Sequence, residues 1–182
     1  GYTTTDISLT EEFTVSLSAT TAAAWSSGGN MNTPRRDNNI GGAGTQTAGL
    51  AFGGEVPGGA VRVANNESYN GTSWTEESDL NTARNNLSGA GTQTAALAFG
   101  GGTATAAAGD GVTEEWNGTS WSEQNDLNTG RGANLGGAGT DTAALAFGGD
   151  EPPISSATEE WTANAPVGAW STSTSVNTGR YA

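Results

Sequence analysis

The stretch GAGTQTAALAFGG, residues 89–101, occurs three times in the chain with few changes. GAGTQTAGLAFGG fills residues 42–54, and GAGTDTAALAFGG fills residues 137–149. The phenylalanines that precede the closing Gly-Gly pairs are 47 and 48 residues apart. Internal similarity at a constant period of this length is typical of repeat architectures, in which one supersecondary unit recurs. We therefore interpret the stretch as part of a structural unit.

Two further markers follow the same period outside this stretch. They are spaced 49, 47 and 49 residues apart, and they are the tryptophans Trp25, Trp74, Trp121 and Trp170 and the arginines Arg35, Arg84, Arg131 and Arg180. These markers predict a single repeat domain over residues 1–182. Its units span residues 1–35 (a partial unit), 36–84, 85–131 and 132–182.

Each unit is predicted to contain four short strands. In the third unit the expected strands are 86–91, 95–101, 112–116 and 120–124, and no helical period of 3.6 residues is present. Asn117-Gly118 between the last two predicts a hairpin turn with positive φ at both residues. Four antiparallel strands at this spacing indicate an all-β fold of β-propeller blades, in a partial or small propeller.

The residue types predict where each strand lies in such a blade. Inner strands converge on an axis, so the small residues Gly89, Ala90 and Gly91 suit the innermost strand. The next strand, residues 95–99, is apolar on both faces, so it is expected to be buried between neighbours. The four period-matched tryptophans are expected on outer strands, where they fill the space between diverging blades.

The composition excludes several functional classes. The chain has 19 acidic residues, six arginines, no lysine and no histidine, and its net charge is −13. A surface without a basic face does not favour nucleic acid or anionic membranes as partners. The absence of cysteine and histidine removes thiolate metal sites and imidazole-based catalysis, so we expect no cofactor and no enzyme activity. The acidic, lysine-free composition favours an extracellular setting.

The order of markers resembles the kelch repeat. That family has an apolar strand ending in Gly-Gly, then an aromatic residue, a tryptophan and a closing arginine, here Gly100-Gly101, Trp116, Trp121 and Arg131. The resemblance implies propeller blades. The histidine and cysteine-linked tyrosine of kelch-type copper oxidases are missing, as is the sialidase Asp-box. The amino-acid sequence of the repeats is also similar to kelch-type repeats in structural proteins of marine tailed phages. This resemblance implies that the protein is located on a virion or cell surface.

The number of units leaves the assembly open. Kelch propellers commonly have six or seven blades, whereas fewer than four units are present here. The chain is a segment of a longer propeller, an open or small ring completed by a partner or a second copy, or a stacked repeat array that is not a propeller.

The repeated arginines have two interpretations. They could form a ring of cationic ligand contacts, or each could make a buried, bidentate pair with a carboxylate. We favour the pair, because a residue that recurs in every unit serves what every unit needs. The accompanying acidic residues are Glu11, Glu67, Glu114 and Glu159.

Two other motifs also have a structural and a functional interpretation. Asp79 and Asp126 could ligate calcium with nearby carbonyls, but Asx-type turns are the favoured interpretation. Asn70-Gly71-Thr72 and Asn117-Gly118-Thr119 match the glycosylation pattern, and for them we favour hairpin turns.

The stretches after each Gly-Gly pair vary in length, charge and proline content. Because binding residues concentrate in loops on a rigid scaffold, these stretches are the predicted recognition face, unless they vary only because nothing constrains them. The candidate ligand-binding residues are Arg62, Asn65, Asp110, Asp150 and Glu151. The leading hypothesis is a non-enzymatic structural or binding propeller that recognises a glycan or protein. The alternative is an architectural subunit of a fibre or tail that contacts copies of itself.

Overall fold

The structure is a computed structural model of the 182-residue chain. It describes residues 24–35, 41–58, 61–103, 109–150, 154–163 and 169–173. The described residues form strands, turns and connecting segments and contain no helix, so the all-β expectation is confirmed.

Three four-stranded antiparallel sheets follow one another along the chain, each with its strands in meander order. The first sheet contains β1 (Gly41–Thr45), β2 (Ala48–Phe52), β5 (Asn66–Tyr69) and β6 (Trp74–Glu76). The second contains β7 (Ser88–Gly91), β8 (Ala96–Phe99), β9 (Thr113–Trp116) and β10 (Trp121–Glu123). The third contains β11 (Leu135–Gly139), β12 (Ala143–Gly148), β13 (Thr158–Thr162) and β14 (Ala169–Thr172). A small hairpin of β3 (Glu55–Val56) and β4 (Val61–Arg62) is inserted between β2 and β5.

The Gly-Gly pairs end the second strand of each sheet because the backbone turns left-handed there. The first glycine of each pair has a φ of +66° at Gly53, +68° at Gly100 and +69° at Gly148. A side chain at Gly100 would also collide, since its Cβ would lie 2.5 Å from Leu135 Cδ2. Glycine adopts this conformation without steric cost, so the pair releases the chain from the strand into the variable segment.

The Asn-Gly turns differ in detail from the sequence prediction. Gly71 and Gly118 have positive φ, but among the described residues only Asn86 and Asn134 do so outside glycine. The expectation of positive φ at Asn117 was therefore wrong. Its Oδ1 instead accepts hydrogen bonds from the backbone N–H groups of Thr119 and Ser120. The side chain thus organises a longer Asx-type turn than the two-residue hairpin expected.

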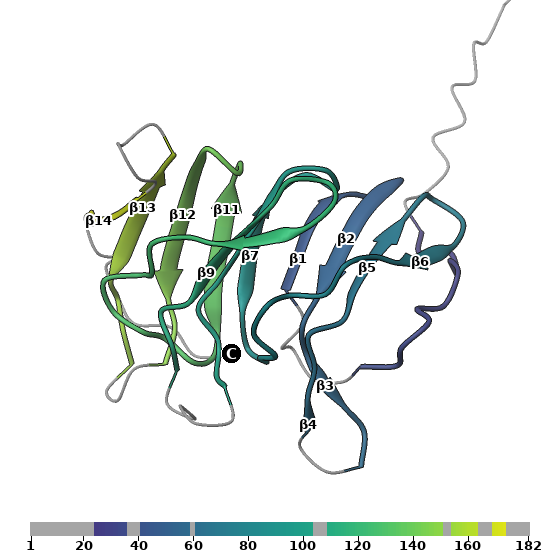
Figure 1. Cartoon of the computed structure of the whole chain (residues 1–182), viewed down its shortest axis with the longest axis horizontal. Coiled ribbons are helices and arrows are strands. Elements are labelled where there is room, and N and C mark those ends of the chain that lie inside the picture. Colours follow the sequence, from purple (N-terminus) through teal and green to yellow (C-terminus); the bar gives the residue numbers. More distant parts are fainter. Residues whose placement is uncertain are drawn as a thin grey trace, which may run out of the picture.

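The inner strands β1, β7 and β11 lie side by side, and the sheets fan outward from them (Figure 1). Their closeness explains the small residues of the GAG stretch. A Cβ at Gly89 would lie 2.7 Å from the carbonyl oxygen of Gly42, and one at Gly137 would lie 2.7 Å from that of Gly89. Any side chain at Gly89 or Gly137 would push the neighbouring strands apart.

Apolar side chains fill the space between consecutive sheets. Trp121 of the second sheet packs edge-on against Phe52 of the first, and Trp170 of the third packs in the same way against Phe99 of the second. The ring centroids are 5.0 Å apart in both pairs, within the range that favours edge-to-face contact. Trp121 and Trp170 therefore belong to the core between two sheets, as expected, whereas Trp74 of the first sheet is half-buried and packs on Tyr69 of its own sheet.

Two expectations about burial were wrong. The second strand is buried on both faces in β8, but in β12 Leu145 and Phe147 are partly exposed because no described element covers that face. Trp25 lies outside any strand with its side chain fully exposed. The residues that the repeat would place beside Trp25, 1–23, lie outside the described part of the chain. The described strands form no closed sheet.

Candidate functional site

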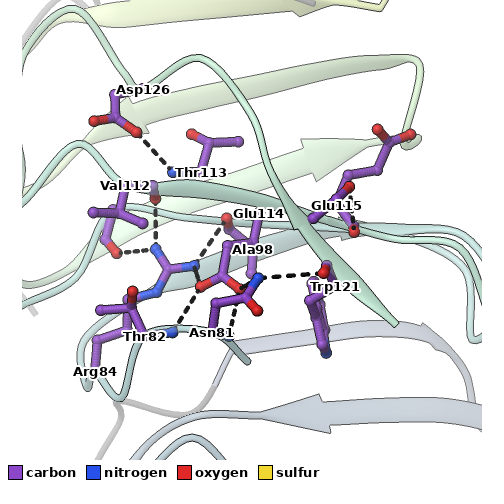
Figure 2. Close-up of polar contacts among 12 residues, drawn as sticks. Asn81, Thr82, Arg84, Ala98, Val112, Thr113, Glu114, Glu115, Trp121 and Asp126 are labelled. Atoms are coloured by element: carbon purple, nitrogen blue, oxygen red, sulfur yellow. Dashed lines mark hydrogen bonds and ion pairs between the residues drawn. The ribbon is translucent and has the colours of Figure 1, made fainter. Parts of the chain in front are cut away.

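Arg84 is the centre of a buried polar cluster in the second sheet (Figure 2). Its Nη2 lies 3.2 Å from Oε1 of Glu114, and both side chains are wholly buried. Nη2 also donates to the carbonyl oxygen of Ala98, and Nη1 donates to those of Gly100 and Val112. The guanidinium therefore connects Gly100, which follows β8, to Val112, which precedes β9.

The carboxylate of Glu114 is held by the segment that enters the sheet. Its Oε2 accepts from the backbone N–H of Asn81 at 2.7 Å and from Nδ2 of the same residue at 3.0 Å. Its Oε1 accepts from the backbone N–H of Thr82 at 3.3 Å. This explains the Asn-Thr pair that precedes each repeated arginine, because the pair supplies donors to a buried carboxylate.

The same cluster occurs in the other two sheets. Arg35 Nη2 lies 2.8 Å from Glu67 Oε1, and Arg131 Nη2 lies 2.6 Å from Glu159 Oε1. Nη1 of each arginine donates to the carbonyl of the first glycine of a Gly-Gly pair, in Gly53 and Gly148 respectively. Arg180 lies outside the described residues. Arg35, Arg84 and Arg131 each end one sequence unit and pair with a glutamate of the next, so the pairs cross the unit boundaries.

The pairs are not bidentate, contrary to the sequence prediction. One guanidinium nitrogen contacts the carboxylate, while the other contacts backbone carbonyls. The Nε atoms of Arg35, Arg84 and Arg131 are buried without a hydrogen-bond partner. The arginine position is thus set by the backbone of the Gly-Gly turn as much as by the glutamate.

Burial controls the electrostatics of this cluster. Loss of solvent lowers the pKa of Arg84, and the charge of Glu114 opposes that effect. The pKa of Arg35 is lowered for the same reason, with Glu67 opposing. A buried ion pair adds little net stability over an apolar core, but removing one partner leaves an uncompensated charge. The arrangement suits a structural anchor, since solvent does not reach the charged groups.

The main chain of the same arginines joins consecutive sheets. The N–H of Gly54 in the first sheet donates to the carbonyl oxygen of Arg84 at 2.9 Å. The N–H of Gly101 in the second sheet donates to that of Arg131, also at 2.9 Å. Arg84 and Arg131 therefore each bind one sheet with the side chain and the preceding sheet with the carbonyl oxygen. Sequence reasoning missed this double role, because the pattern does not show which backbone group faces which.

Most of the candidate ligand-binding residues contact the scaffold. Arg62 Nε donates to Oδ1 of Asn85 at 3.1 Å, and Asn85 Nδ2 donates to the buried Glu55 at 3.0 Å. Asn65 contributes its carbonyl oxygen, which accepts from Gly53 N and Arg35 Nη1. The contacts of Arg62 and Glu55 fasten the β3–β4 hairpin to Asn85, which forms a bridge with Gly102 beside the second sheet, whereas those of Asn65 lie within the first sheet.

The acidic candidates are placed separately from Arg62. Asp110 accepts a hydrogen bond from Thr103 Oγ1 at 2.7 Å, and Asp150 accepts one from Asn134 Nδ2 at 3.4 Å. Glu151 lies outside the described residues. The candidates sit on successive sheets rather than in one cluster, and no group of three or more metal-ligating side chains occurs among the described residues. Asp126 accepts from the N–H of Thr113 at 3.2 Å, a contact to β9 rather than a local turn.

Sequence reasoning overlooked a glutamine between the first two sheets. Gln93 Nε2 donates to the carbonyl oxygens of Gly49 and Tyr69, at 3.1 Å and 2.7 Å. The equivalent position in the third sheet is Asp141, whose carboxylate cannot make these bonds. The change from TQT to TDT was visible in the repeats, but its meaning depends on the neighbouring sheet.

Comparison with protein-family models and with curated protein sequences finds no match. The kelch resemblance therefore rests on the residue pattern described above. Within the described residues, no helix has the length and apolar character needed to cross a membrane.

Proposed function

We propose that the chain is a non-enzymatic structural and binding protein whose sheets are kelch-like β-propeller blades. The kelch markers support this because each has a matching structural position. Gly-Gly ends the second strand, the aromatic residue ends the third, tryptophan occurs near the start of the fourth, and arginine anchors the next sheet. The charged groups of these markers are buried and hold the sheets together. The residues that recognise a partner are therefore expected on other parts of the molecule.

The proposed recognition face is formed by the segments between the second and third strands. The β3–β4 hairpin is one of these segments, and it projects from the body of the first sheet (Figure 1). Val61 at this hairpin is 54 % exposed, whereas Arg62 beside it is anchored through Asn85. A hairpin that is anchored at its base and presents Val61 to solvent has the form of a recognition loop on a rigid scaffold, which supports this face as the contact region. The proposed partner is a glycan or protein surface outside a cell or on a virion.

The test compares retention on a printed glycan array and on immobilised intact bacterial cells. Val61→Ser is expected to weaken retention without changing the thermal midpoint, since the side chain is exposed. Thr119→Ser, in an exposed turn at the opposite end of its sheet, is the matched control and is expected to bind as the parent does. Equal retention by the parent and Val61→Ser on every surface that binds would refute a recognition role for the hairpin.

A second candidate is an architectural subunit that assembles with copies of itself. The observation that favours it is the exposed apolar pair Leu145 and Phe147 on the third sheet. Large apolar side chains that adjoin on a surface commonly mark a protein interface. Sedimentation velocity of the purified chain tests it, and a monomer at all accessible concentrations would count against it.

A further inference from the structure

The open face of the third sheet presents large apolar side chains to solvent. Leu145 is 40 % exposed and Phe147 is 36 % exposed, whereas their counterparts Leu97 and Phe99 in the second sheet are wholly buried. A hollow of about 280 Å³ lies on this face, lined in part by Leu145 and Trp161. Because the sheets are repeats of one unit, the equivalent face of the first sheet shows which groups fit against such a surface.

In the first sheet this place is filled by the second sheet. Trp121 packs edge-on against Phe52, and Gln93 donates its carboxamide protons to the carbonyl oxygens of Gly49 and Tyr69. The space that remains there is about 80 Å³. The face therefore accepts an indole edge near the end of its second strand and a carboxamide near the start.

The third sheet retains the same acceptors. Ala144 pairs with Trp161 in the register in which Gly49 pairs with Tyr69, so the two backbone carbonyls recur in the same relation. Phe147 stands at the position of Phe52, at the end of the second strand. The open face thus has the acceptors for a carboxamide and the ring for an indole, and no sheet among the described residues donates to them.

The matching donor groups lie at the opposite end of the described fold. Gln46 and Trp74 hold, in the first sheet, the positions of Gln93 and Trp121 in the second. Gln46 is exposed, Trp74 is half-buried, and a hollow of about 440 Å³ beside them is lined in part by Tyr69.

Residues 24–29 also border this hollow, and the carbonyl oxygen of Gly29 accepts from Trp74 Nε1 at 3.1 Å. All six of these residues are exposed, so moving residues 24–29 away from the first sheet would expose little additional surface.

We propose that the open face of the third sheet binds the first sheet of a second copy of this chain, head to tail. Gln46 of one copy donates to the carbonyls of Ala144 and Trp161 of the other, and Trp74 packs against Phe147. The proposal rests on the architectural candidate above and names its interface. Because the two faces differ, the contact is heterologous, and repetition gives a ring or a filament.

Charge adds a condition to this assembly. Each copy has a net charge of −13, so copies repel one another at low ionic strength. Raising the salt concentration from about 0.05 M to about 0.5 M screens that repulsion and is expected to strengthen association. An interface held mainly by ion pairs would weaken under the same change.

The experiment uses sedimentation velocity on single-face variants. Leu145→Glu disables the third-sheet face and Gln46→Glu disables the first-sheet face, and each is expected to weaken self-association at least about tenfold. Thr119→Glu adds the same charge at an exposed turn away from both faces and is the control. A 1:1 mixture of Leu145→Glu and Gln46→Glu is expected to form dimers and nothing larger, since each variant keeps one intact face.

The outcomes separate the interface from the broader function. Assembly that survives both substitutions overturns these faces but keeps the architectural candidate, whereas a parent chain that stays monomeric refutes both. If Leu145→Glu abolishes association and Gln46→Glu leaves it unchanged, the third sheet packs against its own copy and the head-to-tail arrangement is wrong. Circular dichroism of each variant checks folding, and Gln46→Glu keeps the test valid if Leu145→Glu unfolds.

Discussion

The guanidinium of Arg131 lies 2.6 Å from the carboxylate of Glu159, and solvent reaches almost none of either side chain. The two residues are 28 positions apart, in different sequence units. Arg131 also accepts a hydrogen bond at its carbonyl from Gly101 of the preceding sheet. One residue therefore contributes to the integrity of two sheets.

Arg131→Ala is expected to lower the free energy of unfolding by about 3–5 kcal/mol, because Glu159 is left as a buried charge without its partner. Urea denaturation measures the loss. Arg62→Ala removes a guanidinium that makes one described hydrogen bond, so it is the control and is expected to cost about 1 kcal/mol. The double variant Arg131→Met/Glu159→Leu is expected to recover part of the loss. An Arg131→Ala protein that is as stable as the parent but is no longer retained on cells or on the glycan array would contradict the anchoring role.

Equivalent glycines on the inner strands are expected to respond differently to alanine. At Gly137 a Cβ would lie 2.6 Å from Ser88 Oγ and 2.7 Å from the carbonyl oxygen of Gly89. Gly137→Ala is therefore expected to cost about 1–3 kcal/mol through overpacking. At the equivalent Gly42 the nearest atom lies 3.5 Å away, so Gly42→Ala is expected to be nearly neutral in the isolated chain. Thermal midpoints compare the two, and equal losses would show that sheet packing is not the cause.

Asp141→Gln is expected to stabilise the contact between the second and third sheets. Asp141 and Gln93 occupy equivalent turns, since each accepts at its carbonyl oxygen from the Nε1 of its own sheet's tryptophan. A glutamine at 141 can donate to the carbonyls of Ala96 and Trp116, as Gln93 donates to Gly49 and Tyr69. We expect a gain of about 1 kcal/mol in the free energy of unfolding. Asp141→Asn, whose shorter amide does not reach both carbonyls, serves as the comparison, and an equal gain there would assign the effect to charge alone.

The stability of the contact between the second and third sheets is expected to depend on pH through Glu115. Burial raises the pKa of Glu115, and the charge of Asp141 raises it further. Between the ordinary pKa and the raised one, the folded chain binds more protons than the unfolded chain, so this group adds stability as the pH falls through that window. Above this pH window Glu115 is charged in both states, and the full cost of burying its charge beside Asp141 lowers the stability of the folded chain. Because Glu115 is partly exposed, the effect is a few tenths of a kcal/mol.

The measurement follows the stability difference between Asp141→Asn and the parent as a function of pH. The difference is expected to be largest at neutral pH and to shrink as Glu115 becomes protonated. Urea midpoints in a common buffer series provide the curve. A difference that is constant with pH would rule out the coupling between Glu115 and Asp141.

The repeated unit was predictable from the sequence because its signals are local. Strand alternation, the Gly-Gly pairs and the Asn-Gly turns each act over a few residues, and together they predicted four antiparallel strands per unit. The structural interpretation of the arginines also rested on repetition alone. The recurrence of glutamate with arginine predicted buried pairs, and the structure contains them in all three described sheets.

The partners in those pairs and the groups at the ends of the fold were not predictable in this way. Gln46 and Gln93 stand in identical TQT turns, yet Gln93 is bonded between two sheets while Gln46 is exposed. Leu145 and Leu97 likewise stand in identical AALAF stretches, and one is partly exposed while the other is buried. Identical local sequence produces different environments because each environment depends on the neighbouring sheet.

The sequence by itself determined the repeat, the all-β class and the exclusion of histidine and cysteine chemistry, since these follow from residue identity and short-range pattern. Only the tertiary structure decided that Arg84 and Arg131 each bind one sheet with the side chain and another with the carbonyl oxygen. It also decided that the inner strands leave no room for a side chain at Gly89 or Gly137, and that no described element covers the apolar face of the third sheet. The physical reason is the same in each case. Burial and hydrogen bonding are properties of surfaces in contact, and the contacts join residues that lie dozens of positions apart.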